Sequence, residues 1–312
     1  MKQTYLGIDI GSVSCNTALI NEDTVLYTSY ARVHGKPIDT IQNELKKIKE
    51  KFKDIEIKGV CCTGTARFLI GKIVGADVVK NEITCHATGT MHFVPDVRTI
   101  LEIGGQDSKI IIVKDKVVTD FAMNTVCAAG TGSFLDQQAA RLGIKIEGFG
   151  DEALQSQKEV VVRGRCGIFA ESDIINKQML GHKREDILMG LCKALVRNYM
   201  NNVAKGKNIV PPVVLQGGVA ANKGIKKAFE DELGTEVIIP MHYNVMGALG
   251  AALLAQEAKP EKTNFKGFDI SDAEFSVDSF ICTDCPNHCE ITVVYENEKK
   301  IAHLGSKCGK YL

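Results

Sequence analysis

The sequence ILEIGGQDSKIIIV, residues 100–113, alternates apolar positions around a pair of glycines. This pattern predicts two strands joined by a tight turn at Gly104 and Gly105. GIDIGSVSCNTALI, residues 7–20, repeats the arrangement earlier in the chain. Each stretch places an aspartate, Asp9 or Asp107, beside a turn whose backbone N–H groups can bind phosphate oxygens. We interpret the two stretches as halves of an internal structural duplication.

A third glycine turn lies in VVLQGGVAANKG, residues 213–224, where Gly217 and Gly218 separate a strand from a helix. Flat Gly-Gly backbone can lie against an adenine or a ribose. Any one of these turns alone indicates an ordinary hairpin. Three in this order, followed by the small-residue helix GALGAALLAQEA, form a far more specific pattern.

Composition narrows the class of protein. The chain has 312 residues, 45% of them hydrophobic, which suits two lobes around large cores. Lys plus Arg equals Asp plus Glu at 38 each, so no basic field indicates nucleic acid or a membrane surface as a partner. No apolar run is long enough to span a bilayer and no signal peptide is evident, so we expect a cytoplasmic protein. The 11 cysteines then indicate metal, redox or buried thiols rather than disulfides.

The three turns and the small-residue helix resemble the superfamily of actin, sugar kinases and heat-shock ATPases over residues 4–257. The resemblance implies an α/β, two-lobed actin-like (ribonuclease H-like) ATPase fold with duplicated lobes that binds ATP or ADP with Mg²⁺. It also implies that Asp9 and Asp107 order Mg²⁺ and the attacking water, with Gln106 helping to position that water. The residues expected to contact the nucleotide are Gly11, Ser12, Val13, Ser14, Gly104, Gly105, Gly130, Gly132, Gly217, Gly218 and Asn222.

Two cysteines lie where helices are predicted to begin. NTVCAAGTGSFL, residues 124–135, places Cys127 before one helix, and RGRCGIFAESDIINKQM, residues 163–179, places Cys166 before another. A helix N-terminus lowers the pKa of a thiol and favours negative charge, which suits an anionic cluster. A 4Fe–4S cubane needs four thiolate ligands, so two cysteines cannot complete it. A two-fold symmetric dimer would supply two cysteines from each protomer. Small buried core residues remain an equally good interpretation of each cysteine alone.

Within this fold, two sequence motifs resemble a more specific family: CAAGTGSFLDQQA and RCGIFAESDII. The family is the BadF/BadG/BcrA/BcrD type, which comprises activators of 2-hydroxyacyl-CoA dehydratases and ATPase subunits of benzoyl-CoA reductases. The resemblance implies a homodimer with one 4Fe–4S cluster, held by Cys127 and Cys166 of each protomer. Ferredoxin or flavodoxin would donate the electron, and a dehydratase, a benzoyl-CoA reductase-like enzyme or a double-cubane protein would accept it. A small-molecule, sugar-type kinase and a non-catalytic metal-bound nucleotide sensor are the alternatives.

The end of the chain departs from compact activators. CTDCPNHCE and GSKCGKYL carry Cys282, Cys285, Cys289 and Cys308. Four thiols at this density indicate a Zn²⁺ site or a second Fe–S cluster, in which His288 or His303 could replace one ligand. The tail is similar to the junction in longer activator-like proteins, which leaves open whether the chain is a fragment.

The remaining cysteines and lysines receive plainer interpretations. We expect five cysteines to be core packing: Cys15, Cys61, Cys62, Cys85 and Cys192. Lys109 and Lys177 are interpreted as ordinary exposed lysines. The expected organisation is lobe I at residues 1–96 with a helix at 245–258, lobe II at 97–244, a linker at 259–279 and a cysteine-rich metal-binding extension at 280–312.

Overall fold

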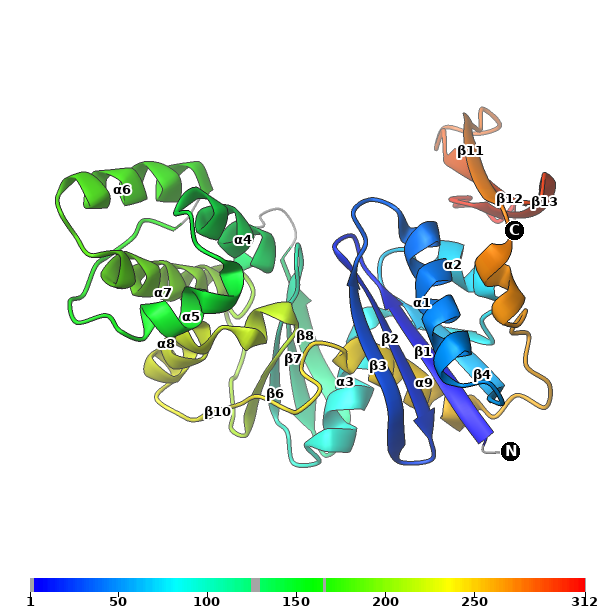
Figure 1. Cartoon of the computed structure of the whole chain (residues 1–312), viewed down its shortest axis with the longest axis horizontal. Helices are drawn as coiled ribbons and strands as arrows, with labels where there is room; N and C mark the ends of the chain where they lie inside the picture. The colour runs from blue at the N-terminus through cyan, green and yellow to red at the C-terminus, as the bar shows by residue number, and fades with distance from the viewer. Residues whose placement is uncertain (1–2, 125–129, 165–166, 312) are drawn as a thin grey trace. The chain divides into compact units, whose positions relative to one another are not determined.

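The computed structural model describes residues 3–124, 130–164 and 167–311 (Figure 1). Its contacts divide the chain into two units, which are described one at a time. The first comprises Met1–Gly89 and Gly247–Leu312, and the second comprises Thr90–Met246. Among the described residues, no helix combines the length and the apolar character that crossing a bilayer requires.

The first unit is built on a five-stranded sheet ordered β3-β2-β1-β4-β5. Its central strand β1 pairs antiparallel with β2 and parallel with β4. The residues of β1 after Gln3 are buried, because helices or strands cover both faces of a central strand. The strands are β1 (Gln3–Ile10), β2 (Ser14–Asn21), β3 (Thr24–Arg32), β4 (Glu56–Thr63) and β5 (Val78–Val79).

The helices of this unit pack by apolar faces and by glycine. The apolar face of α1 buries Ile41, Leu45 and Ile48. The predicted small-residue helix is confirmed as α9 and lies very close to its neighbours. A Cβ on Gly250 would stand 1.8 Å from the carbonyl oxygen of Cys85, so a side chain there is excluded. The helices are α1 (Pro37–Lys51), α2 (Arg67–Val74), α3 (Glu82–Phe93) and α9 (Met246–Ala258).

The second unit repeats the same sheet. Its order is β10-β9-β6-β7-β8, so the central strand β6 pairs antiparallel with β7 and parallel with β9, as β1 does with β2 and β4. The predicted duplication is therefore confirmed. The strands are β6 (Thr99–Ile103), β7 (Ser108–Lys114), β8 (Val117–Met123), β9 (Val213–Gln216) and β10 (Val237–Ile238).

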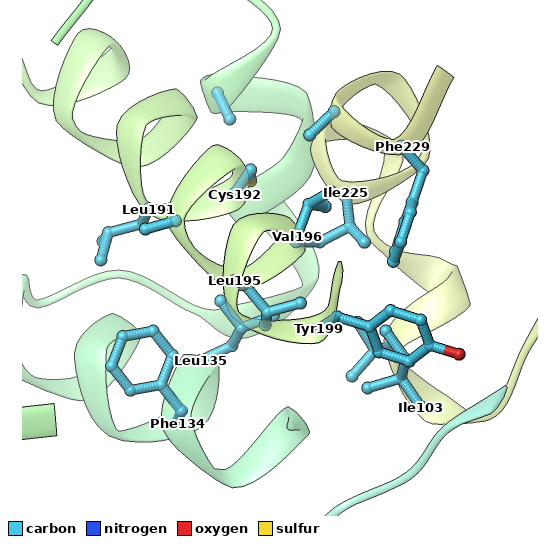
Figure 2. Packing of buried hydrophobic residues seen from close by; sticks show 14 of the residues in the cluster. Ile103, Phe134, Leu135, Leu191, Cys192, Leu195, Val196, Tyr199, Ile225 and Phe229 are labelled. Carbon is cyan, nitrogen blue, oxygen red and sulfur yellow. The ribbon is translucent and has the colours of Figure 1, made fainter. Parts of the chain in front are cut away.

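Helices of the second unit enclose one apolar core with the sheet. Figure 2 shows Phe134 and Leu135 of α4 near Leu195 of α7, and Tyr199 of α7 near Phe229 of α8. The Tyr199 and Phe229 ring centroids are 5.3 Å apart and nearly perpendicular, a favourable edge-to-face contact. The helices are α4 (Gly132–Arg141), α5 (Ile146–Ala153), α6 (Gly167–Met179), α7 (Arg184–Asn202), η2 (Gly218–Ala221) and α8 (Lys223–Leu233).

The C-terminal region adds a three-stranded sheet, β11-β12-β13, to the first unit. Residues 259–279, expected to be a linker, include contacts with that unit: Gln42 Nε2 donates to the carbonyls of Ile270 at 2.9 Å and Ala273 at 2.7 Å. Ile270 and Val294 are buried in the unit's apolar core. The elements are η3 (Phe268–Asp272), β11 (Phe275–Ile281), β12 (Glu290–Glu296) and β13 (Lys299–Leu304).

Candidate functional site

The first glycine turn, residues 11–14, joins β1 to β2. The N–H of Gly11 donates to the carbonyl of Ser14 at 2.9 Å, which closes the turn over Ser12 and Val13. Asp9 lies at the end of β1 and is 8% exposed. Its carboxylate lies against α9, because a Cβ on Gly247 would stand only 2.3 Å from Asp9 Oδ2. The first turn of a helix favours an anionic carboxylate, so this position suits a charged Asp9.

The second glycine turn, residues 104–107, has the same closure between β6 and β7. The N–H of Gly104 donates to the carbonyl of Asp107 at 2.9 Å. Gln106 is exposed and Asp107 is half-buried, so both predicted catalytic side chains lie at the surface of the turn. Gly105 precedes Gln106 in the turn, and its carbonyl accepts a hydrogen bond from the N–H of Ser133.

The duplication reveals two residues that sequence reasoning missed. Glu102 takes the place in β6 that Asp9 takes in β1, two residues before the first glycine of each turn. Lys109 was expected to be exposed, and that expectation is wrong: it is 3% exposed and pairs with Glu102, Nζ to Oε2, at 3.0 Å. Alignment of the motifs DIGS and EIGG could have indicated Glu102. The residues near Lys109 in the sequence, in contrast, do not indicate that it is buried.

A buried tyrosine supports this pair from α7. The hydroxyl of Tyr199 donates to the backbone carbonyl of Lys109 at 2.7 Å. Burial raises the pKa of Tyr199 well above its usual value, and the charge of Glu102 raises it further. The hydroxyl therefore stays protonated as a donor at neutral pH.

The third glycine turn, Gly217 and Gly218, follows β9. Gly217 has φ +89°, and a Cβ there would stand 2.3 Å from the carbonyl oxygen of Ile103, so this backbone path requires glycine. Asn222 caps α8 by accepting from the N–H of Ile225 at 3.1 Å. Its buried Nδ2 has no hydrogen-bond partner in the part of the chain that the structure describes. This N–H donor lies beside the glycine turn and could donate a hydrogen bond to an acceptor atom of a nucleoside.

Hydrogen bonds fasten α4 directly to the second turn. The N–H groups of Gly132 and Ser133 donate to the carbonyls of Gly104 at 2.9 Å and Gly105 at 2.8 Å. Two of the first N–H groups of the helix are thus satisfied by the turn itself. A Cβ on Gly132 would stand 3.0 Å from the carbonyl oxygen of Gly104, so glycine permits this close approach. The structure therefore gives the Gly132 amide a protein partner rather than leaving it open for a phosphate.

The other end of the same connection is also fastened to the second turn. Asn124 Oδ1 accepts from the N–H of Ser108 at 2.7 Å, and its Nδ2 donates to the carbonyl of Gln106 at 3.2 Å. Cys127, predicted as a cluster ligand, lies between these anchors but outside the described residues. The segment that carries it thus begins and ends at the second turn.

Cys166 also lies outside the described residues, yet both cysteine segments approach one residue of α7. Asn198 Nδ2 donates to the carbonyl of Gly164, two positions before Cys166. A Cβ on Gly130, three positions after Cys127, would stand 3.9 Å from Asn198 Cβ. Described residues near the two predicted ligands, Gly130 and Gly164, therefore both lie close to Asn198.

The tail cysteines gather at one end of their sheet. The register Ile281↔Glu290 and Thr292↔Leu304 brings the β11–β12 connection and the segment after β13 to that end. Cys282 and Cys289 are buried there and bonded through the backbone, N–H to carbonyl, at 2.8 Å, whereas Cys308 is exposed. Across the described ranges, no three His, Cys, Asp or Glu side chains stand ready to hold a metal ion.

The core cysteines behave as packing residues. Cys15 and Cys62 belong to the apolar core of the first unit, and Cys192 belongs to that of the second. Burial raises the pKa of all three thiols, so they stay protonated and unreactive. The packing interpretation is confirmed for these three.

Solved structures share this architecture. The (R)-2-hydroxyglutaryl-CoA dehydratase component A of Acidaminococcus fermentans matches with a TM-score of 0.78 at 32% identity, over 83% of this chain and 99% of that one. The activator of the 2-hydroxyisocaproyl-CoA dehydratase from Clostridium difficile, with bound ADPNP, matches with a TM-score of 0.77 at 33% identity, over 82% and 96%. The expected fold is confirmed: it is an α/β actin-like ATPase fold with duplicated lobes. A C-terminal three-stranded sheet is present in addition.

Sequence comparison agrees. A 2-hydroxyisocaproyl-CoA dehydratase activator of Clostridioides difficile is 34% identical over 265 residues, which cover 84% of this chain and 98% of the relative. The (R)-2-hydroxyglutaryl-CoA dehydratase activating ATPase of Acidaminococcus fermentans is 34% identical over 254 residues, covering 80% and 96%. Residues 6–255 match the BadF/BadG/BcrA/BcrD ATPase family, and the chain belongs to that family.

Proposed function

We propose that this chain is an ATP-dependent electron-transfer activator. In this proposal Cys127 and Cys166 of both protomers of a homodimer hold one 4Fe–4S cluster. A ferredoxin or flavodoxin reduces it, and a metalloenzyme such as a 2-hydroxyacyl-CoA dehydratase, a benzoyl-CoA reductase-like or a double-cubane protein receives the electron. Relatives named as dehydratase activators support this acceptor class.

One observation carries the proposal: the Cys127 segment is anchored at both ends to the second glycine turn. Asn124 bonds Ser108 and Gln106 on one side, and Gly132 and Ser133 bond Gly104 and Gly105 on the other. A displacement of the turn by phosphate would therefore move Asn124 and the start of α4, the described residues that flank Cys127. A kinase that only transfers phosphate has no need of this connection.

The residues present fit a magnesium nucleotide. Asp9 lies at the first turn, and its cross-strand neighbour Asn16 has a buried Oδ1 without a partner among the described residues. Such oxygens suit Mg²⁺ or its bound water. We assign the phosphates to the first and second turns and the nucleoside to Gly217, Gly218 and Asn222. A relative with bound ADPNP supports nucleotide binding.

Hydrolysis then divides among these residues. Asp9 would hold the hydrated Mg²⁺, while Gln106 and Asp107 would orient the water that attacks the terminal phosphate of ATP, giving ADP and phosphate. The cluster supplies one-electron chemistry when it is bound. The second turn accepts hydrogen bonds from α4 and, in this proposal, binds phosphate, so it would convert the nucleotide state into a position of α4.

The proposal is tested on the wild-type protein purified anaerobically. We expect a brown dimer with iron near four per dimer from the bridging cluster, because a cubane contains four irons. We also expect Mg²⁺-dependent ATP hydrolysis and a reduced-state EPR signal that differs between the ADP and ADPNP forms. A colourless monomer that hydrolyses ATP would instead support the kinase alternative, and a metal-bound protein without ATP hydrolysis would support the sensor alternative.

Gly132→Ala should uncouple α4 from the second turn. Its Cβ would lie 3.0 Å from the Gly104 oxygen and 3.2 Å from Val219 Cγ2, so the helix start must shift. We expect the difference in amide exchange of residues 132–135 between the ADP and ADPNP forms to fall at least about fivefold. Gly148→Ala in α5 is the matched control, because a Cβ there meets nothing within 4 Å. An undiminished nucleotide effect in Gly132→Ala would contradict the coupling.

We further propose that the four tail cysteines bind Zn²⁺ or a second Fe–S cluster. This requires the Cys308 segment to close onto the sheet end where Cys282 and Cys289 already pack together. Removing the whole tail is a poor test, because Ile270 and Val294 complete the core of the first unit. The less buried Cys285 and Cys308 are better targets.

The double variant Cys285→Ser/Cys308→Ser should therefore lose the tail metal and keep the bridging iron. Serine preserves size but is a poor ligand for soft metal sites. Zinc and iron per protomer are measured by elemental analysis of wild type and variant. Identical metal contents in the two proteins would show that these thiols hold none.

A further inference from the structure

The two sheets match position by position at their glycine turns. In the first, Asp9 pairs with Asn16 on β2 and Thr63 on β4, and in the second, Glu102 pairs with Lys109 on β7 and Gln216 on β9. The glycines that follow β4 and β9 match as well. Gly64 and Gly217 have φ +93° and +89°, and a Cβ on either would stand 2.3 Å from the carbonyl oxygen of Ile10 or Ile103. Glu102, rather than Asp107, is therefore the counterpart of Asp9.

The two carboxylates have different neighbours across the strand. Asn16 faces Asp9, whereas Lys109 faces Glu102 and forms an ion pair whose two side chains are 4% and 5% exposed. The lysine charge offsets the charge of Glu102. The second carboxylate is therefore less suited to a divalent cation than Asp9 is.

Glu102 instead contacts the backbone of two turns. A Cβ on Gly104 would stand 3.3 Å from Glu102 Oε1, and a Cβ on Gly217 would stand 2.8 Å from the same atom. The carboxylate thus lies against the second and the third turn at once, while Oε2 is held by Lys109. Tyr199 in turn holds the Lys109 backbone.

We propose that Glu102 and Lys109 form a positioning pair that sets the separation of the second and third turns, and with it the fit of a nucleoside polyphosphate. The inference rests on the proposed function, which assigns phosphate to one turn and nucleoside to the other. Buried ion pairs add little net stability compared with neutral residues of the same size. Two neutral side chains could therefore fill the same space without loss of stability. Holding a carboxylate in a fixed place between two turns, in contrast, requires the lysine as its partner.

Three variants separate positioning from stability: Glu102→Gln, Lys109→Met and the double variant. Each single change leaves one buried charge without its partner, so we expect a Tm several degrees lower. The double variant removes both charges and should recover most of the wild-type Tm. We nevertheless expect its Kd for ADP, measured by calorimetry with Mg²⁺ present, to stay about tenfold weaker than wild type, because misplaced binding groups lose affinity even in a stable fold. KM for ATP should rise in parallel, with a smaller change in kcat.

The exposed ion pair Lys207–Asp120 of the same unit provides the control. Lys207→Met/Asp120→Asn should keep wild-type affinity for ADP. A Glu102→Gln/Lys109→Met protein with wild-type Tm, Kd and KM would overturn the proposal and make the pair purely structural. If wild-type protein itself fails to bind ADP or ATP, the proposed function fails instead, so the two failures are distinguishable.

Discussion

Cys127→Ser is expected to produce a protein that lacks the bridging cluster but still hydrolyses ATP. Symmetry repeats each substitution, so one change removes two of the four ligands that a bridging cubane needs. Serine keeps the size and polarity of cysteine but binds iron–sulfur clusters poorly. The glycine turns are unaltered, and the anchors of the segment at Asn124 and Gly132 remain. Cys166→Ser should behave in the same way.

The measurements are iron content, the reduced-state EPR signal and ATP hydrolysis under anaerobic conditions. We expect the iron of the bridging cluster to fall from near four per dimer to almost none in both variants. Cys62→Ala is the matched control, because that thiol is buried in the core of the first unit. Retention of the bridging cluster in both serine variants would require its ligands to be sought among other cysteines, and the proposed route from the second turn to the cluster would fail.

Asp9→Asn is expected to reduce Mg²⁺-dependent ATP turnover by ~10²-fold or more, as removal of a positioned catalytic group does. Asparagine preserves the shape of the side chain but not the charge that holds hydrated Mg²⁺. The Asp9 carboxylate lies against the first turn of α9, where a helix N-terminus interacts favourably with a negative charge. Asp107→Asn should also lower turnover while leaving nucleotide binding largely intact, because its half-buried side chain belongs to the surface of the second turn.

Phosphate release and nucleotide affinity are measured separately for these variants. Asp269→Asn is the control, because its exposed carboxylate pairs with the exposed Lys49 of the first unit, away from the glycine turns in sequence. Wild-type turnover in Asp107→Asn, combined with loss in Asp9→Asn, would remove Asp107 from the catalytic set. Wild-type turnover in both would remove the first and second turns from the hydrolytic site.

The three glycine turns, the duplicated strands and the family were accessible from the sequence because their signals are local. Gly104 and Gly105 interrupt two apolar stretches within a few positions, and Gly217 adopts a positive φ that side chains disfavour. The α1 stripe of Ile41, Leu45 and Ile48 likewise follows helical periodicity. Such features depend on backbone sterics and burial within one element, so nearby residues suffice to predict them.

Only the tertiary structure decided what the charged and polar groups do. The sequence around Lys109 indicates an ordinary exposed lysine. The pairing of β6 with β7 instead places it beside Glu102, where it is buried in an ion pair. The bonds from Gly132 and Ser133 to the second turn join residues that are distant in sequence. The tail contributes Ile270 to the core of the first unit although its composition indicates a linker. Burial and hydrogen-bond partners across such separations depend on which elements pack together, and no local pattern of residues specifies that.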